Sequence, residues 1–64
     1  MYRTFMRTWW RRNPAWPGGR EPHAGRKSYA GNYSTEAEAR AACIAHNEAN
    51  DPGFLSRKME YERS

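Results

Sequence analysis

The chain has few of the aliphatic residues that build most protein cores. Among its 64 residues, leucine, isoleucine and phenylalanine together number four, and valine is absent. So few large apolar residues, combined with a net charge of +4, approach the composition of disordered chains. Nine aromatic residues oppose that conclusion, because each can bury about 150–250 Å² and supply a thin core of rings and alanines. We therefore expect one small domain over residues 1–64. Its size excludes a multi-domain enzyme and a large substrate cavity.

Cysteine and histidine are also scarce. Cys43 is the only cysteine, so no intrachain disulfide can form. One cysteine and two histidines cannot make a four-ligand zinc site without carboxylates, and we expect no metal and no other cofactor. Cys43 and His46 could pair as nucleophile and base, but no third residue is placed to orient the histidine. We therefore expect no catalytic residues and no enzyme activity.

Long apolar runs are missing as well. No stretch of about 18 apolar residues exists, and arginines interrupt the apolar residues of the N-terminus every few positions. We therefore expect neither a signal peptide nor a transmembrane helix. A cytoplasmic protein with no membrane partner is the resulting prediction.

Arginine, by contrast, is abundant and concentrated in one half of the chain. Residues 1–33 carry seven bases and one acid, whereas residues 34–64 carry four bases and six acids. Nine of the eleven bases are arginine, whose planar guanidinium group matches phosphate and carboxylate geometry. This segregation favours an anionic partner for the N-terminal half.

Residues 2–12 are rich in aromatics and threonine and lack glycine and proline, which is typical of a strand. We expect the even positions to face the core, because strand side chains alternate between two faces. The odd positions alternate bases with rings: Arg3, Phe5, Arg7, Trp9 and Arg11. Guanidinium groups bind phosphates and rings stack on unpaired bases, so this face is a candidate binding surface. The alternatives are a strand buried on both faces, or cation–π pairs that cover exposed rings.

Residues 13–25 hold three prolines and three glycines, which predicts a long irregular loop. Trp16 lies between Pro14 and Pro17, and two roles are open for it: an interface anchor, or a ring that folds back to complete the core. Residues 26–33 are expected to form a second strand, in which Gly31 indicates a bulge or a close backbone approach. Bases before, within and after the loop complete the candidate binding set: Arg12, Arg20, Arg26 and Lys27.

Residues 35–49 are predicted to form a helix. Thr35 followed by Glu38 fits a capping box, and alanine dominates the residues that follow. The face expected to pack on the strands consists of Ala37, Ala41, Ala42, Ile44, Ala45 and Ala49, and the face expected to lie opposite consists of Glu36, Arg40, Cys43 and Asn47.

Residues 54–63 are ambiguous. Leu55 and Met59 fit a helical pair, whereas Leu55, Met59 and Tyr61 also share one face of a strand. The good helix formers among these residues favour a short C-terminal helix. The predicted fold is therefore α+β: a small β-β-α domain in which an antiparallel ribbon packs on one Ala-rich helix, followed by a short helix. Because a ribbon leaves exposed edges, a C₂ homodimer is a further expectation.

Residues 26–50 resemble a known family. A basic strand (Arg26-Lys27-Ser28-Tyr29) leads through Tyr33-Ser34-Thr35 into an Ala/Glu-rich helix, as in the arm-type DNA-binding module of phage and transposon tyrosine integrases. This resemblance implies a small antiparallel sheet that enters the DNA major groove, with Arg7, Arg11, Arg26 and Lys27 facing the DNA. The compact format also resembles small orphan bacteriophage proteins, including anti-defence and anti-CRISPR inhibitors, and implies a bacterial host cell.

Three functional hypotheses follow. The first is a non-enzymatic phage-type protein that docks through its basic–aromatic face on a host nucleic acid or nucleoprotein complex and inhibits or redirects it by occupancy. The second is an arm-type DNA-binding module that marks a site for a larger enzyme. The third is an adaptor that binds an acidic host protein.

Overall fold

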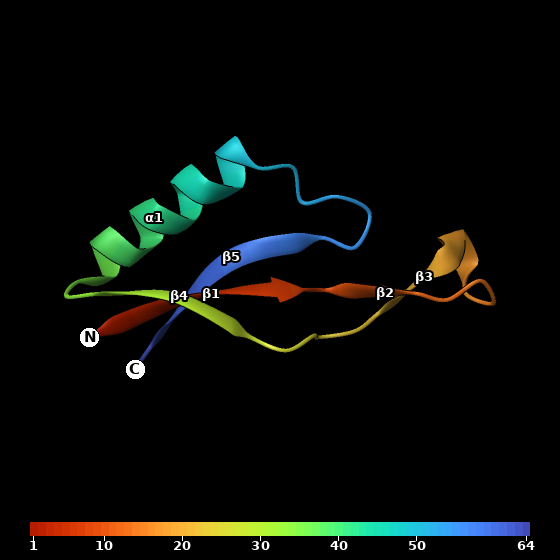
Figure 1. The fold of residues 1–64 in the computed structure, drawn as a ribbon, viewed down its shortest axis with the longest axis horizontal. Coiled ribbons are helices and arrows are strands. Elements are labelled where there is room, and N and C mark those ends of the chain that lie inside the picture. The colour runs from red at the N-terminus through yellow and green to blue at the C-terminus, as the bar shows by residue number, and fades with distance from the viewer.

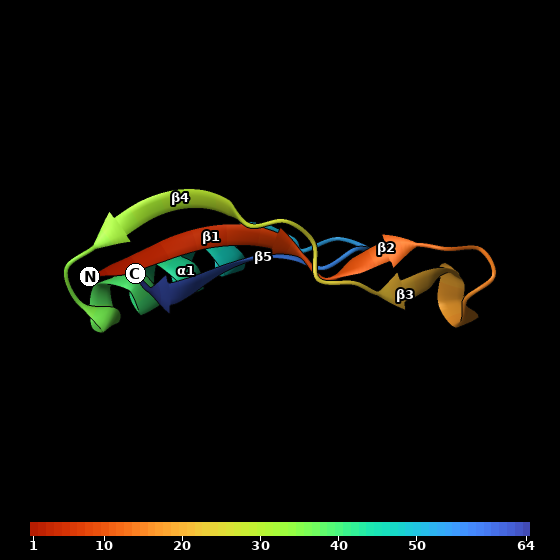
Figure 2. The same ribbon diagram turned by 90° about the horizontal axis from the view of Figure 1, so that it is seen from below.

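The computed structural model describes all 64 residues and contains five β-strands and one α-helix, which confirms the predicted α+β class. The elements are β1 (Tyr2–Thr8), β2 (Trp10–Arg12), β3 (Arg20–Pro22), β4 (Ser28–Tyr33), α1 (Glu36–Ala49) and β5 (Arg57–Arg63). Strands β4, β1 and β5 form one antiparallel sheet in that order, and β2 and β3 form a separate hairpin. The molecule is long and thin, 43 × 23 × 13 Å, because the hairpin extends away from the main sheet (Figures 1 and 2).

Helix α1 covers only one face of the main sheet (Figure 1). Strands β4 and β5 are both antiparallel to β1, so they run parallel to each other and need a crossover, which α1 provides. The helix packs against β5 and, to a smaller extent, against β1 and β4. The opposite face of the sheet is therefore left without a covering element.

The pairing of β1 with β4 contains a bulge between Thr4 and Phe5, as the glycine at position 31 indicated. Thr4 lies opposite Gly31, whereas Phe5 lies opposite Tyr29, so Ala30 is the extra residue. A Cβ atom at position 31 would lie 3.5 Å from the Tyr33 ring, within ordinary contact distance. Such a bulge bends the strand that carries it and increases its local twist.

The helix begins as predicted. The Thr35 side chain accepts a hydrogen bond from the Glu38 backbone N–H at 3.2 Å and donates one to Glu38 Oε1 at 2.9 Å. The first of these bonds satisfies an otherwise unpaired N–H of the first turn, because the first four helical N–H groups have no partner within the helix.

The predicted inner face of the helix is wrong. Ile44 is 50% exposed, and the residues that contact the sheet come mostly from the face expected to point outward. Cys43 and Ala39 are buried, and Asn47 and Glu36 bond to β5 through Met59 and the Tyr61 hydroxyl. Small side chains let the helix approach closely, and polar ones satisfy the groups of an edge strand. A count of apolar residues per face does not capture either effect.

The C-terminal helix is also wrong: residues 57–63 form β5, which pairs with β1 along its whole length. Met59 lies opposite Met6, and Tyr61 lies opposite Thr4, on the side that faces α1. The strand face shared by Met59 and Tyr61 therefore outweighed the local helix propensity, because those side chains complete the only core the chain has.

The predicted loop over residues 13–25 is only partly irregular. Its residues 20–22 form β3, which pairs with β2, and residues 17–19 form a 3₁₀ turn. The first strand is correspondingly interrupted at Trp9, where Trp9 N–H and Trp10 N–H both donate to the Leu55 carbonyl. The second strand begins at Ser28 and not at residue 26. We call residues 10–22 the arm.

Candidate functional site

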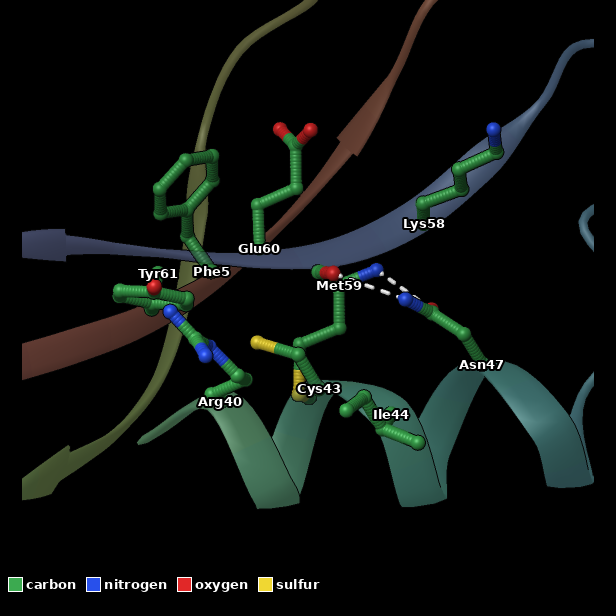
Figure 3. Close-up of a pocket in the computed structure, with 9 residues that line it drawn as sticks. All are labelled: Phe5, Arg40, Cys43, Ile44, Asn47, Lys58, Met59, Glu60 and Tyr61. Atoms are coloured by element: carbon green, nitrogen blue, oxygen red, sulfur yellow. Dashed lines mark hydrogen bonds between the residues drawn. The ribbon is translucent and has the colours of Figure 1, made fainter. Parts of the chain in front are cut away.

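The uncovered face of the main sheet is the candidate site, and we call it the open face. Register places Arg3 beside Glu62, Phe5 beside Glu60, and Arg7 beside Lys58. Paired residues of antiparallel strands project to the same side, which here is the side away from α1. Figure 3 shows Phe5, Lys58 and Glu60 on the far side of β5 from the helix, whereas Met59 points toward it.

The rings of the open face support cations. The Arg7 guanidinium lies 5.5 Å from the Phe5 ring centroid and 5.2 Å from that of Trp9. Arg3 lies 4.5 Å above Tyr29, and the Lys27 ammonium lies 4.9 Å from Phe5. Phe5 is consequently only 5% exposed, although its strand position faces away from the helix. The expected alternation holds for Arg3, Phe5, Arg7 and Trp9, but Arg11 lies in the arm and not on this face. The bases lie over the rings, as in the alternative of cation–π pairs, and form the outer layer.

One carboxylate organises the β4 side of this face. Glu62 accepts a hydrogen bond from Arg3 Nε at 2.6 Å, forms an ion pair with Lys27, and accepts a weak bond from the Tyr29 hydroxyl at 3.4 Å. The Lys27 ammonium and the Arg3 guanidinium hold the pKa of the Glu62 carboxyl below its usual value. The carboxylate is therefore ionised at neutral pH and keeps both cations in place.

Arg7 has no such partner. Its Nε atom is buried between the two rings and makes no hydrogen bond. Arg7 is one of seven bases, out of eleven, that form no ion pair. These seven are Arg7, Arg12, Arg20, Arg26, Arg57, Lys58 and Arg63. The positive charges of these seven side chains are therefore not paired with carboxylates of the protein.

The arm adds a second cluster of bases and rings. The Arg20 guanidinium lies 4.4 Å from the Trp10 ring and donates a hydrogen bond to the Phe54 carbonyl at 2.6 Å. Arg12 lies 5.0 Å from the Phe54 ring. Arg11 alternates to the other side of the hairpin and pairs with Glu21, whose pKa it lowers. The segment that precedes β5 is thus bound to the arm through the pair of residues next to its turn.

Trp16 is at the end of the arm and is 46% exposed. The alternative in which it folds back into the core is therefore wrong. The turn around it is held by hydrogen bonds from Trp16 N–H to the Asn13 carbonyl at 3.0 Å and from Gly19 N–H to the Trp16 carbonyl at 2.9 Å. Gly18 and Gly19 have φ angles of 78° and 79°, which glycine adopts without strain.

Charge is segregated in space as well as in sequence. The segment 34–56, which contains the helix and its flanking turns, carries four acids and one base: Glu36, Glu38, Glu48, Asp51 and Arg40. All other acids and bases lie on the strands, the arm or the linker before β4. The helix side is therefore acidic, and the sheet and arm are basic.

The ten candidate residues fall into three places. Arg3, Phe5, Arg7, Trp9 and Lys27 meet on the open face, and Arg11, Arg12, Trp16 and Arg20 belong to the arm. Arg26 lies exposed in the linker between arm and β4 and contacts no carboxylate. Sequence reasoning missed Lys58 and Glu62, because these residues face outward only if residues 57–63 form a strand. The available signal for this strand was the alternation of the charged residues Lys58, Glu60 and Glu62 with Met59 and Tyr61.

Other chemistry has little support in the structure. Burial, with a contribution from Glu60, raises the pKa of the Cys43 thiol, which disfavours the reactive thiolate. No three residues of the metal-binding types gather into a possible site. The groove between α1 and β5 is lined largely by the residues that join these two elements, as Figure 3 shows. No helix of the protein has the length and apolar character needed to cross a bilayer.

Comparison with known proteins adds no identification: no family model, no curated protein and no solved structure matches this chain. The open face and the arm are therefore the features that bear on its function.

Proposed function

We propose that this chain is a non-enzymatic protein that binds the phosphate backbone of a nucleic acid, free or within a nucleoprotein complex, and acts by occupying it. One observation carries the proposal: Arg7, whose guanidinium lies within 5.5 Å of the Phe5 and Trp9 ring centroids on the open face, forms no ion pair with any carboxylate of the protein. A guanidinium held by rings is positioned before any ligand arrives, so little side-chain entropy is lost on binding. The partner favoured by such a surface is polyanionic.

The charge distribution supports the same conclusion at longer range. The acidic helix lies on the covered side of the sheet, so a polyanion is repelled from that side and attracted to the open face and arm. Inhibition of a host nucleic-acid machine, as in the small bacteriophage proteins that the chain resembles in format, needs no more than this docking.

A second candidate is the arm-type DNA-binding module. The observation that favours it is the architecture: a three-stranded antiparallel sheet with one helix on one face and bases on the other. The two candidates share the same anionic ligand class and differ in whether the bound protein blocks a machine or marks a site for one.

The test is the salt dependence of binding. Fluorescence anisotropy with labelled duplex and single-stranded DNA and RNA, repeated at several salt concentrations, gives the number of phosphate contacts. We expect Arg7→Ala to weaken binding and to reduce the slope of log K against log salt by about 0.7–0.9. Arg40→Ala is the matched control, because it removes the same charge from the helix side, and we expect it to change the slope less.

Absence of binding to every probe at low salt would contradict the proposal. An acidic protein surface would then be the favoured partner, as the adaptor hypothesis states.

A further inference from the structure

The rings of this protein differ in what lies over them. Phe5, Trp9, Trp10, Tyr29 and Phe54 each have a cation within 5.5 Å of the ring centroid. Tyr2 and Tyr61 pack edge to face against each other, with ring centroids 6.3 Å apart, on the helix side of the sheet. Only Trp16 and Tyr33 have neither a cation over them nor another ring against them. Tyr33 pairs with Tyr2 on the helix side, so Trp16 is the one such ring on the basic side of the molecule.

Trp16 is also held in place. Asn13 accepts the Trp16 N–H at its carbonyl and the Ala15 N–H at its side-chain Oδ1, and its own N–H donates to the Gly19 carbonyl. The turn from Asn13 to Gly19 contains two prolines and no charged residue. An uncovered indole is therefore presented on an ordered turn at the end of the long axis, with Arg12 and Arg20 directly behind it.

We infer that Trp16 stacks on an unpaired nucleobase, so that the ligand has a base-exposed segment next to the backbone that the open face binds. This inference rests on the proposed function and specifies its ligand. Stacking on an aromatic ring needs a free π-face and tolerates any base, and cations nearby retain the adjoining phosphates. Phe5 is only 5% exposed, and Tyr29, although 54% exposed, already has the Arg3 guanidinium over its ring. Trp16 is 46% exposed and has no cation or ring against it.

The ligand must be long enough to reach both surfaces. Duplex DNA rises about 3.4 Å per base pair along each strand, so the 43 Å axis of the protein spans roughly 12 base pairs. A duplex of about 16 base pairs with a short single-stranded overhang is therefore a suitable probe. A second probe has the same overhang built from abasic sites, which retain the phosphates and remove the bases.

The measured quantity is the ratio of affinities for the normal and the abasic overhang. We expect the normal overhang to bind roughly 5- to 150-fold more tightly, because the loss of one base–aromatic stacking contact weakens binding by about this factor. Trp16→Ala and Trp16→Leu should both bring this ratio of affinities close to one, whereas Trp16→Phe should keep it above one. Arg7→Ala should weaken both probes and leave the ratio unchanged, because it acts on phosphate contacts.

The outcomes separate the two proposals. If the unmodified protein binds both overhangs equally, stacking by Trp16 is overturned while backbone binding stands. If Trp16→Leu keeps the ratio, the tip acts through apolar contact, as it would in a protein pocket, and the inference is again overturned. If neither probe binds, the proposed function itself fails. Thermal melts of each variant establish that the arm and sheet remain folded.

Discussion

Glu62 is the residue on which most of the open face depends. It bonds to Arg3 of the central strand, to Lys27 before β4 and to Tyr29 within β4. One carboxylate on β5 therefore connects all three strands of the sheet on the side that carries no helix. Its two cations are also two of those proposed to face the ligand, so Glu62 positions them and partly neutralises them.

The lowered pKa of Glu62 predicts how stability depends on pH. A carboxyl whose pKa is lower in the folded protein stabilises the fold above its unfolded-state pKa of about 4.3, and this stabilisation is lost as the pH falls through the folded-state value. We expect the melting temperature to fall steeply below about pH 4.3. In Glu62→Gln this fall should be shallower, because one linked carboxyl is gone.

Circular dichroism melts between neutral and strongly acidic pH test this expectation. Glu48→Gln is a suitable control, since Glu48 is exposed and forms no ion pair. Parallel curves for Glu62→Gln and the unmodified protein would show that the network does not contribute.

Phe5 illustrates how far residue-level prediction reached. Alternation along the strand correctly placed it on the same face as Arg3 and Arg7, away from the even-numbered core residue Thr4. Cover by Arg7, two positions away, is the cation–π alternative that the sequence already offered. Cover by Lys27 could not be predicted, because Lys27 is 22 positions away in the chain and meets Phe5 only in the folded structure.

At the scale of elements, the β5 edge of the sheet is protected by contacts with α1 and the segment that follows it. The outward N–H and carbonyl of Met59 in β5 bond to the side-chain amide of Asn47 at 2.9 and 3.0 Å, as the dashed lines of Figure 3 mark. The outward N–H of Arg57 bonds to the Pro52 carbonyl at 2.9 Å. Asn47 thus occupies the place that a neighbouring strand would take, which discourages pairing along this edge.

Asn47→Ala should therefore have two effects. We expect a loss of about 1–2 kcal/mol in the free energy of unfolding, because two hydrogen bonds between helix and strand disappear. We also expect increased self-association, since the edge of β5 becomes available to a second chain. Urea denaturation measures the first effect and sedimentation velocity the second. The neighbouring exposed residue gives the control, Glu48→Ala, for which a change within about 0.5 kcal/mol is expected. An Asn47→Ala protein that matched this control would contradict the role of the amide.

A helix or strand could be predicted from the sequence where the residues that determine it lie within a few positions of one another. The start of α1 was found because Thr35 and Glu38 bond to each other over one turn. Residues 57–63 were misassigned because their strand state depends on β1, which lies more than 45 positions earlier. Without that partner, the local preference for a helix was the only guide.

For the whole molecule, the decisive feature is that its two ends are neighbours in the sheet. Tyr2 lies opposite Arg63, and Ser64 donates to the Met1 carbonyl through its backbone N–H. Figure 1 accordingly shows both termini at the same end of the molecule. The core is therefore complete only when β5 has paired with β1, and a domain of this size is marginally stable.

Removal of residues 57–64 should therefore abolish cooperative folding. The truncated chain loses one of three strands, the Met59 and Tyr61 contacts with the helix and the Glu62 network. We expect no sigmoidal thermal transition and poor dispersion of amide resonances. Removal of Ser64 alone is the control and should leave the transition intact. A cooperative melt of the longer truncation would mean that β5 is an accessory strand.

What the amino-acid sequence determined by itself is local or additive: the α+β class, the capped helix, the two faces of the first strand and the excess of arginine in the first half. Each depends on neighbours within a few positions or on composition. Tertiary structure alone decided which helix face packs inward, that the C-terminal residues form a strand, which rings are covered by cations and that Trp16 is left uncovered. These outcomes depend on contacts between residues tens of positions apart, where burial and pairing across the sheet outweigh local propensity.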